Sequence, residues 1–515
     1  MRAIALCLGV ALVTLTARAV AREATAQALK SPTALAATSA SRRAVALSWT
    51  PGDPGLTTFI VERKPLGASW TPPPPPAKSP IVSTPVSATT AADSAIDPFG
   101  TYVYRVRASG AAGALSAPSN EIVVGPPPVG FSQVVVAPAA MQDSSRFGLG
   151  LSLALDANSD PAIAYHIYDP NGDDNAEDTT LQFVSWNRAQ YRWNAPVQVG
   201  VVGLIDTGTA RKGLSLAFDA STNRFALAHM QGTREVRIAM STDGVVWQDQ
   251  VVDVPDEGSS AEPSLALAGG RVVLAYAIEN SVRVRTGAQT DPPSKWTTET
   301  APILPGMWRP RKTGISVAID GTGKPAVAYW IDPDSGQNMA LAIWRPGQSA
   351  PAKIADTADY QNDVLEARLA FSGTRAAAAF VARRDEKFFD GEHEIWFSSS
   401  ADGGATWTPV VPLPADGGHG MGTPISLALD RQGHPALVAP FSHGNDSGAR
   451  CGRPELIRST DGVKWTTCAP GGKGTPTGSP DYAHVVFADN DKLYVAFTAS
   501  SAGGALKAGL VLWRE

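Results

Sequence analysis

The chain has 515 residues, of which 43% are hydrophobic and 18% charged, and its formal net charge is −5. The length favours two to four domains, and the lack of a basic excess disfavours nucleic acid as a partner. The 48 Gly and 41 Pro residues suit many short strands joined by turns, whereas three Cys exclude a dense disulfide scaffold or a multi-cysteine zinc site.

The N-terminus has the features of a secretory signal peptide. A basic residue precedes an apolar run at positions 3–15, and small-residue triplets follow, the last at 26–28. The run is too short to cross a hydrocarbon core of about 30 Å. We therefore predict a signal peptide over residues 1–28 and a mature protein without a membrane span, exported to the extracellular space or the periplasm.

Export also determines how the cysteines are interpreted. After cleavage, Cys451 and Cys468 are the two that remain. In an oxidising compartment they are predicted to form a disulfide, the alternative being two free buried thiols.

Residues 31–125 contain short strands separated by turns, with alternating positions at 44–49, 58–63 and 102–108. The Trp that ends the first of these strands, the run Tyr-Val-Tyr-Arg-Val-Arg-Ala and a later Pro-Ser-Asn-Glu resemble a fibronectin type III domain. The resemblance implies a seven-stranded β-sandwich, which is usually a spacer or adhesion module. Prolines then predict a stiff linker at 126–130.

One unit recurs through residues 131–515. Its marker is the second position of an apolar-Ser-apolar-Ala-apolar-Asp motif, occupied in chain order by Ser152, Ser215, Ser264, Ser316, Arg368, Ser426 and His484. Successive markers are 49 to 63 positions apart, near the roughly 40–50 residues of a four-stranded propeller blade plus loops. No helical periodicity separates the strands, which excludes a parallel α/β fold.

The seventh unit reaches the C-terminus after its third strand. The segment 132–138 resembles fourth strands elsewhere, such as 248–255. We predict that it closes the ring as the outer strand of the last blade, which protects the sheet edges. The predicted fold is all-β: a fibronectin type III sandwich followed by a seven-bladed β-propeller closed by an N-terminal outer strand.

Three turns between third and fourth strands share a Ser-x-Asp-Gly motif that ends on Trp. Their Asp and Trp residues are Asp243 and Trp247, Asp402 and Trp407, and Asp461 and Trp465. Ser and Asp oxygens can accept backbone N–H bonds within such a turn, Gly can supply a positive φ, and Trp buries a large surface between strands.

These turns are Asp boxes, and residues 130–515 resemble the sialidase-like (bacterial neuraminidase repeat) β-propeller superfamily. The resemblance implies that the boxes are structural and lie opposite the face that carries an active site. The chain departs from sialidases because it lacks their Arg-Ile-Pro motif and has seven units where six are usual. A Tyr nucleophile with a Glu partner cannot be placed by motif.

Several residues break the repeat near the expected channel. Arg368 and His484 replace the small Ser of the innermost strand, and functional sites are where such breaks fall. The segment that leads into the unit of Ser316 contains Trp308, Arg309 and Arg311, and Arg211 stands at the equivalent place before Ser215. Trp308 could stack on a sugar while the arginines bind anionic groups; the alternative is ordinary capping of the channel.

Two acidic segments are further candidates. Asp169, Asn171, Asp173 and Asp174 could hold Ca²⁺, although the EF-hand spacing is absent and a solvated acidic loop is the alternative. Glu392 and Glu394 offer paired carboxylates for glycoside hydrolysis. No cofactor is required.

These features favour an exported glycan- or surface-binding protein. Its expected partner is an extracellular glycan or a cell-surface protein, and it is expected to be a monomer. A glycoside hydrolase that uses loop carboxylates and a protein-interaction or adhesion scaffold are the alternatives.

Overall fold

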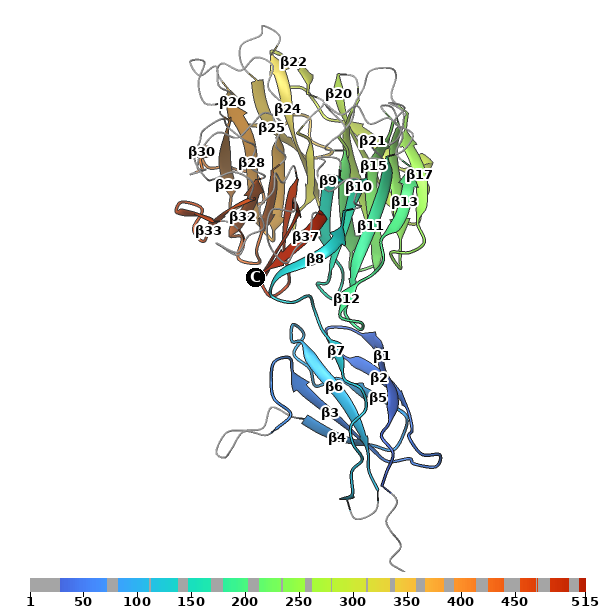
Figure 1. Ribbon diagram of the computed structural model, residues 1–515. Coiled ribbons are helices and arrows are strands. Elements are labelled where there is room, and N and C mark those ends of the chain that lie inside the picture. The colour runs from blue at the N-terminus through green and yellow to red at the C-terminus, as the bar shows by residue number, and fades with distance from the viewer. Residues whose placement is uncertain are drawn as a thin grey trace, which may run out of the picture. The chain divides into compact units, whose positions relative to one another are not determined.

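The computed structural model describes residues 28–71, 82–110, 113–137, 147–167, 179–201, 213–232, 235–254, 262–278, 280–311, 314–333, 339–357, 366–383, 393–413, 425–439, 454–468, 470, 482–499 and 509–515. Nearly all regular structure in these residues is β-strand (Figure 1). The predicted signal peptide lies outside the described residues except for its last position. No helix among the described residues has the length and hydropathy needed to cross a bilayer.

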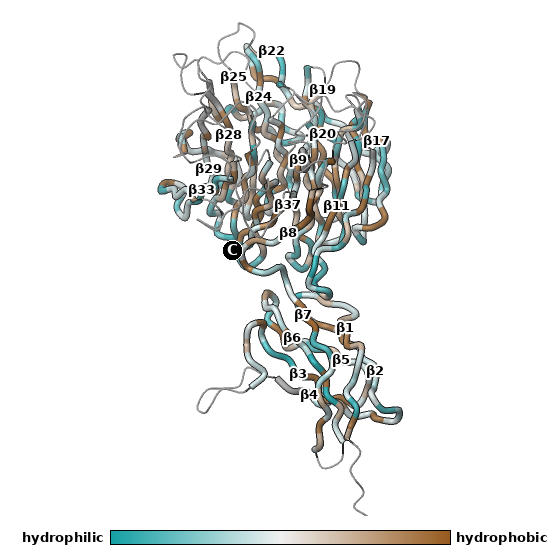
Figure 2. Tube along the Cα trace, in the orientation of Figure 1, coloured by the Kyte–Doolittle hydropathy of each residue, from teal (hydrophilic) through white to brown (hydrophobic). Residues whose placement is uncertain are grey.

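The chain divides into two units. The first comprises Met1–Thr38, Ala46–Ala92 and Val103–Ile122, and the second comprises Ser39–Val45, Asp93–Tyr102 and Val123–Glu515. In both units apolar residues recur along the strands and hydrophilic ones gather in the turns, as expected where alternate side chains are buried (Figure 2).

The N-terminal strands form two antiparallel sheets. The first sheet has the strand order β1 (Thr33–Ala40), β2 (Val45–Thr50) and β5 (Thr90–Asp93). The second has the order β4 (Val82–Val86), β3 (Phe59–Pro65), β6 (Tyr102–Ala108) and β7 (Ile122–Val124). Trp49 of β2 packs edge-on against Phe59 of β3 with ring centroids 5.5 Å apart, and Tyr104 is fully buried. The two sheets therefore share a core built from the alternating residues that the sequence places inside.

The second unit holds seven further sheets among the described residues, called sheets 1 to 7 in chain order. Sheet 1 contains β9 (Phe147–Leu155), β10 (Pro161–Ile167), β11 (Thr180–Asn187), β12 (Arg192–Trp193) and β13 (Val197–Val201). Sheet 2 contains β14 (Leu214–Asp219), β15 (Arg224–Gln231), β16 (Glu235–Ser241) and β17 (Gln248–Asp253). Sheet 3 contains β18 (Ser264–Ala268), β19 (Arg271–Ile278), β20 (Ser281–Ala288) and β21 (Thr297–Thr300), with the short 3₁₀ helix η5 (Pro293–Lys295) between the last two.

The remaining four sheets follow the same meander. Sheet 4 contains β22 (Met307–Pro310), β23 (Ser316–Ile319), β24 (Pro325–Pro333), β25 (Met339–Trp344) and β26 (Ala352–Thr357). Sheet 5 contains β27 (Ala367–Ser372), β28 (Arg375–Arg383), β29 (His393–Ser400) and β30 (Val411–Pro412). Sheet 6 contains β31 (Ser426–Leu429), β32 (Pro435–Ala439), β33 (Glu455–Ser459) and β34 (Trp465–Cys468). Sheet 7 contains β35 (Ala483–Phe487), β36 (Leu493–Ala499), β37 (Gly509–Arg514) and β8 (Gly130–Val136).

The first strands of the seven sheets form a ring, in which β23, and not the preceding short strand β22, represents sheet 4. Each contacts the first strand of the next sheet, in the order β9, β14, β18, β23, β27, β31 and β35, and β35 contacts β9. The sheets stack through complementary faces, because small Ala226 and Ala228 of β15 pack against bulky Leu274 and Tyr276 of β19. The ring surrounds a central channel.

The last sheet is completed from the start of the second unit. β8 pairs antiparallel with β37, from Gly130 opposite Arg514 to Val136 opposite Gly509, which is the closing pair that the sequence predicted for segment 132–138. Gly509 has a φ of 143°, and a Cβ at this position would collide with the Val135 carbonyl oxygen. The close approach of the two strands therefore needs glycine here.

The predicted proline linker is packed against the second unit. Gly125 and Pro127 are buried. The Gly125 carbonyl accepts a hydrogen bond of 2.9 Å from Nε1 of Trp186, and the Arg514 guanidinium donates to the Pro127 carbonyl. Sheets 1 and 7 thus hold these residues directly.

The three Ser-x-Asp-Gly turns are hydrogen-bonded from within. In the first, Asp243 Oδ1 accepts the N–H groups of Val245 and Val246 at 2.8 and 2.9 Å, and these bonds lower the pKa of Asp243. Trp247 packs against Phe183 of sheet 1 with centroids 4.9 Å apart. Because strands alternate in direction, these turns lie at the end of the ring opposite to where the first strands begin.

Candidate functional site

The channel is a cavity of about 210 Å³ lined by the first strand of every sheet. Its wall is formed around the marker positions of the repeat, which the sequence identified as Ser152, Ser215, Ser264, Ser316, Arg368, Ser426 and His484. The strands all enter the channel from the same end, here called the channel mouth.

Each of the five marker serines joins its sheet to the next one. Ser152 Oγ accepts the Leu216 N–H at 3.0 Å, and Ser316 Oγ accepts the Leu369 N–H at 3.0 Å. The other three hydroxyls accept the amides of Leu265, Val317 and Val485 at 2.9 to 3.1 Å. The sequence explained these serines only as small residues for packing, whereas the structure shows that the hydroxyl satisfies a backbone donor of the neighbouring sheet.

Arg368 forms an ion pair with a buried carboxylate in the channel wall. Its Nη2 lies 2.9 Å from Glu366 Oε2, and Glu366 is 1% exposed. The guanidinium also donates to the carbonyls of Ile425 and Ala367 at 2.8 and 3.0 Å. These bonds fix the guanidinium against the start of sheet 6.

His484 brings a neutral imidazole to the same wall. Burial and the nearby charge of Arg368 lower the pKa of His484 to about 3. Its Nδ1 is buried without a hydrogen-bond partner among the described residues. At neutral pH the ring therefore presents uncharged nitrogen atoms beside a guanidinium.

Glu262 adds a second buried carboxylate at the mouth. It lines the channel and its Oε2 accepts the Gly314 N–H at 3.1 Å. Glu262 stands two positions before Ser264, just as Glu366 stands two positions before Arg368. Sequence analysis missed both, although sheets 1, 2 and 4 have Gly at this position, so a charged residue there was a visible break of the repeat.

Trp308 stands outside the channel on β22. Its side chain is 52% exposed, and it is the one aromatic residue among the large exposed hydrophobic residues in the described part of the chain. The Arg309 guanidinium lies over the indole, 4.0 Å from the ring centroid. Asp332 holds both arginines, with Oδ1 2.7 Å from Arg311 Nε and Oδ2 3.5 Å from Arg309 Nε.

Trp308 and the channel mouth lie at the same end of the ring. β22 pairs with the last residues of β24, and the Arg311 N–H donates to the Trp330 carbonyl at 2.8 Å. The chain then reaches Gly314, whose amide contacts Glu262 in the channel. The platform of Trp308, Arg309 and Arg311 thus borders the polar mouth.

Other predicted site residues cannot be placed. Arg211, Glu392 and the four calcium candidates at 169–174 lie outside the described residues. Glu394 lies in β29 opposite Ala382, and its side chain is outside what the structure describes. No group of three His, Cys, Asp or Glu side chains in the described ranges could hold a metal ion.

The predicted disulfide is not shown among the described residues. Cys468, at the end of β34, is an exposed free cysteine there. Its predicted partner Cys451 lies outside the described residues, so the pairing stays a prediction.

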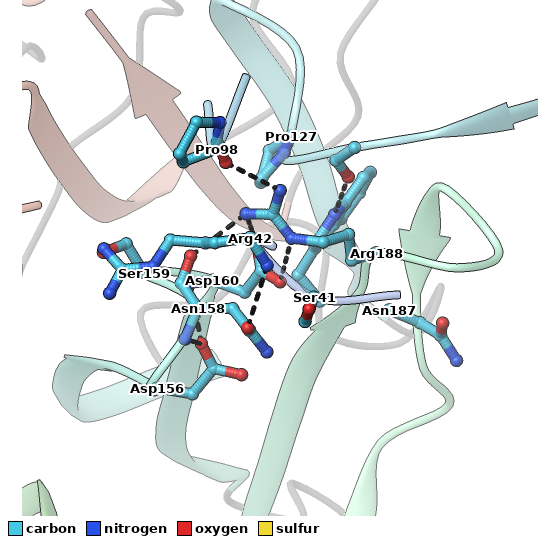
Figure 3. A network of polar contacts seen from close by, with 12 residues as sticks. Ser41, Arg42, Pro98, Pro127, Asp156, Asn158, Ser159, Asp160, Asn187 and Arg188 are labelled. Carbon is cyan, nitrogen blue, oxygen red and sulfur yellow. Dashed lines mark hydrogen bonds and ion pairs between the residues drawn. The ribbon is translucent and has the colours of Figure 1, made fainter. Parts of the chain in front are cut away.

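A second polar network lies at the end opposite the channel mouth (Figure 3). Arg188 forms a bidentate ion pair with Asp160, in which both N–O distances are 2.9 Å. The guanidinium also donates to the Asn158 carbonyl at 3.0 Å. Asp156 Oδ1 accepts the N–H groups of Asn158 and Asp160. These bonds tie Arg188 to the turn that follows β9, so the network serves as a structural clasp for the first turn of sheet 1.

Comparisons with known proteins give distant likenesses. No protein-family model and no curated protein matches the chain. An α-L-arabinofuranosidase from Fusarium graminearum is 12% identical with a TM-score of 0.42, over 75% of this chain and 97% of that one. A protein of unknown function from Dyadobacter fermentans is 14% identical with a TM-score of 0.41, over 75% and 98%. A Hadza microbial sialidase is 12% identical with a TM-score of 0.39, over 92% and 93%. Likenesses of this size carry no activity over to this chain.

Proposed function

We propose that the protein is an exported glycan-binding protein. In this proposal sheets 1 to 7 are the blades of a seven-bladed, sialidase-like propeller, and residues 31–125 are a fibronectin type III spacer. The ring of first strands and the closing pair of β8 with β37 support the first assignment. The Trp49–Phe59 core between two sheets supports the second.

The observation that carries the proposal is the exposed Trp308. The Arg309 guanidinium lies over the Trp308 indole, which is still half-exposed and so leaves aromatic surface that a sugar ring can cover. Arg309 and Arg311 bring two positive charges to one Asp332, so this platform has a net positive charge. An apolar plane beside guanidinium groups suits a sugar ring that carries carboxylate or sulfate groups.

The test uses affinity electrophoresis through gels that contain polygalacturonate, with dextran as the neutral polymer. We expect retardation of the full chain by polygalacturonate alone. Trp308→Ala should weaken binding at least tenfold, and Trp308→Phe should keep most of it because the flat ring remains. Val463→Ala, which removes an exposed apolar side chain at the opposite end, should bind like the natural protein.

Two outcomes would overturn the proposal. One is unchanged retardation of Trp308→Ala, which would place the ligand elsewhere. The other is hydrolysis of the polymer on incubation with the protein, seen as new reducing ends without the unsaturated ends of an elimination, which would make the protein a glycoside hydrolase. Export is tested separately by N-terminal sequencing of protein from the culture fluid, where the chain should begin near residue 29.

A further inference from the structure

We propose a second ligand site, for a small molecule that carries one carboxylate, at the end of the ring opposite the channel mouth. A cavity of about 130 Å³ opens there between sheets 5 and 6. Its polar lining comes from Arg375, Ser399, Ser400, Thr408, His434, Thr460 and Asp461. The site is independent of the glycan platform, because Trp308 lies at the other end.

The cavity exists because a filling side chain is missing. Between sheets 4 and 5 the equivalent space holds Arg345, whose Nη1 bonds Asp320 Oδ2 at 2.9 Å and whose Nη2 donates to the Gly403 carbonyl of the next sheet. By strand register, Ser399 occupies in sheet 5 the position that Arg345 occupies in sheet 4. A serine cannot reach across to sheet 6, so the space stays open.

A positive charge without a partner faces this space. Arg375 is exposed, and its side chain forms no hydrogen bond or ion pair with any described residue. Its aliphatic stem lies over Gly433, whose φ is 82° and where a Cβ would collide with the Arg375 side chain. Glycine at 433 thus makes room for the arginine, which is held beside the cavity by packing.

The other ionisable groups of the cavity are already bonded. His434 Nδ1 lies 2.8 Å from Asp430 Oδ2. Asp461 Oδ1 accepts the N–H groups of Val463 and Lys464 at 2.8 and 2.7 Å. The guanidinium of Arg375 is therefore the group left to bind a ligand.

These groups define the ligand class. A guanidinium binds a carboxylate through two parallel N–H bonds, and the hydroxyls of Ser399, Thr408 and Thr460 can bond a ligand's own hydroxyl groups. The two nearby aspartates disfavour ligands with several negative charges. A hydroxy acid the size of a sugar acid fits this description.

The experiment is calorimetric titration of the full chain with sodium D-glucuronate, with D-glucose as the uncharged control. We expect millimolar binding of glucuronate and none of glucose. Arg375→Gln should weaken glucuronate binding at least tenfold. Ser399→Arg should abolish it, because the new side chain fills the cavity as Arg345 does in the preceding sheet.

Polygalacturonate electrophoresis of Arg375→Gln and thermal melting serve as controls. Arg375→Gln should be retarded by polygalacturonate like the natural protein, so failure of the glycan platform and failure of this site are separable. Ser399→Arg should melt within a few degrees of the natural protein, which shows that lost binding reflects a filled cavity. Absence of glucuronate binding, or equal binding by the natural protein and Arg375→Gln, would overturn the proposal.

Discussion

Sheets 1 to 4 and sheet 6 place a serine hydroxyl in the channel wall, whereas sheets 5 and 7 place Arg368 and His484 there. Each serine accepts an amide N–H of the following sheet. Arg368 instead bonds two carbonyls and Glu366, and His484 leaves Nδ1 without a partner in the described residues. Serine thus joins neighbouring sheets, and its two replacements concentrate polar groups in one sector of the channel.

The largest expected effect comes from breaking the ion pair of sheet 5. Arg368→Ala removes the guanidinium from Glu366, a nearly inaccessible carboxylate, and should lower the free energy of unfolding by about 3–5 kcal/mol. Urea denaturation followed by tryptophan fluorescence measures this change. The double variant Arg368→Ala, Glu366→Gln should recover part of the loss because no charge remains to be buried. Equal denaturation midpoints for the natural protein and Arg368→Ala would contradict the assigned role.

A smaller effect is expected in a sheet whose marker residue is a serine that bonds the next sheet. Ser316→Ala leaves the Leu369 amide without its acceptor and should cost about 1–3 kcal/mol. The same urea experiment measures it, with Ser349→Ala at an exposed turn as a control that should change little. If both variants denature alike, the hydroxyl of Ser316 contributes only its size.

The smallest effect at neutral pH is expected from placing a serine at the marker position of sheet 7. His484→Ser supplies a hydroxyl for the Leu153 amide and should stabilise the protein by about 0.5–1.5 kcal/mol. Unfolding curves at pH 7 measure this difference. A loss of stability on this substitution would show that the imidazole itself holds sheets 7 and 1 together.

The same substitution should change the response to acid. The pKa of His484 is about 3 in the fold and about 6.5 in an unfolded chain. Between these values the unfolded chain binds one more proton, so the free energy of unfolding falls as the pH is lowered, by up to about 1.4 kcal/mol per unit. Stability measured from pH 7 to 4 should therefore fall less steeply in His484→Ser, and parallel curves would contradict this.

The sequence predicted the ring through its spacing. The apolar-Ser-apolar-Ala pattern marks the first strands because stacked sheets need small and bulky faces in register, and the unfinished seventh unit predicted the pairing of β8 with β37. The Asp243, Asp402 and Asp461 turns also followed from local chemistry, since their hydrogen bonds lie within a few residues.

The polar contacts between sheets could not be predicted in the same way. The bond from the Leu216 amide to Ser152 joins residues 64 positions apart, and a repeat pattern does not say which neighbour a hydroxyl meets. Arg368 was singled out from the sequence, but its partner Glu366 was not. The cavity beside Arg375 depends on what Ser399 fails to fill, which only the packed sheets reveal.

The pairing of β8 with β37 also has a consequence for the time order of folding. The side chain of Gln133 donates to the carbonyl of Leu510, a contact across 377 positions of chain. A ribosome makes the first of these segments long before the second, so β8 must wait with an open hydrogen-bonding edge until the final residues emerge. Completion of the circle thus waits for β37, and a chain that lacked most of this strand would leave the facing edges of β36 and β8 without the partner that β37 supplies.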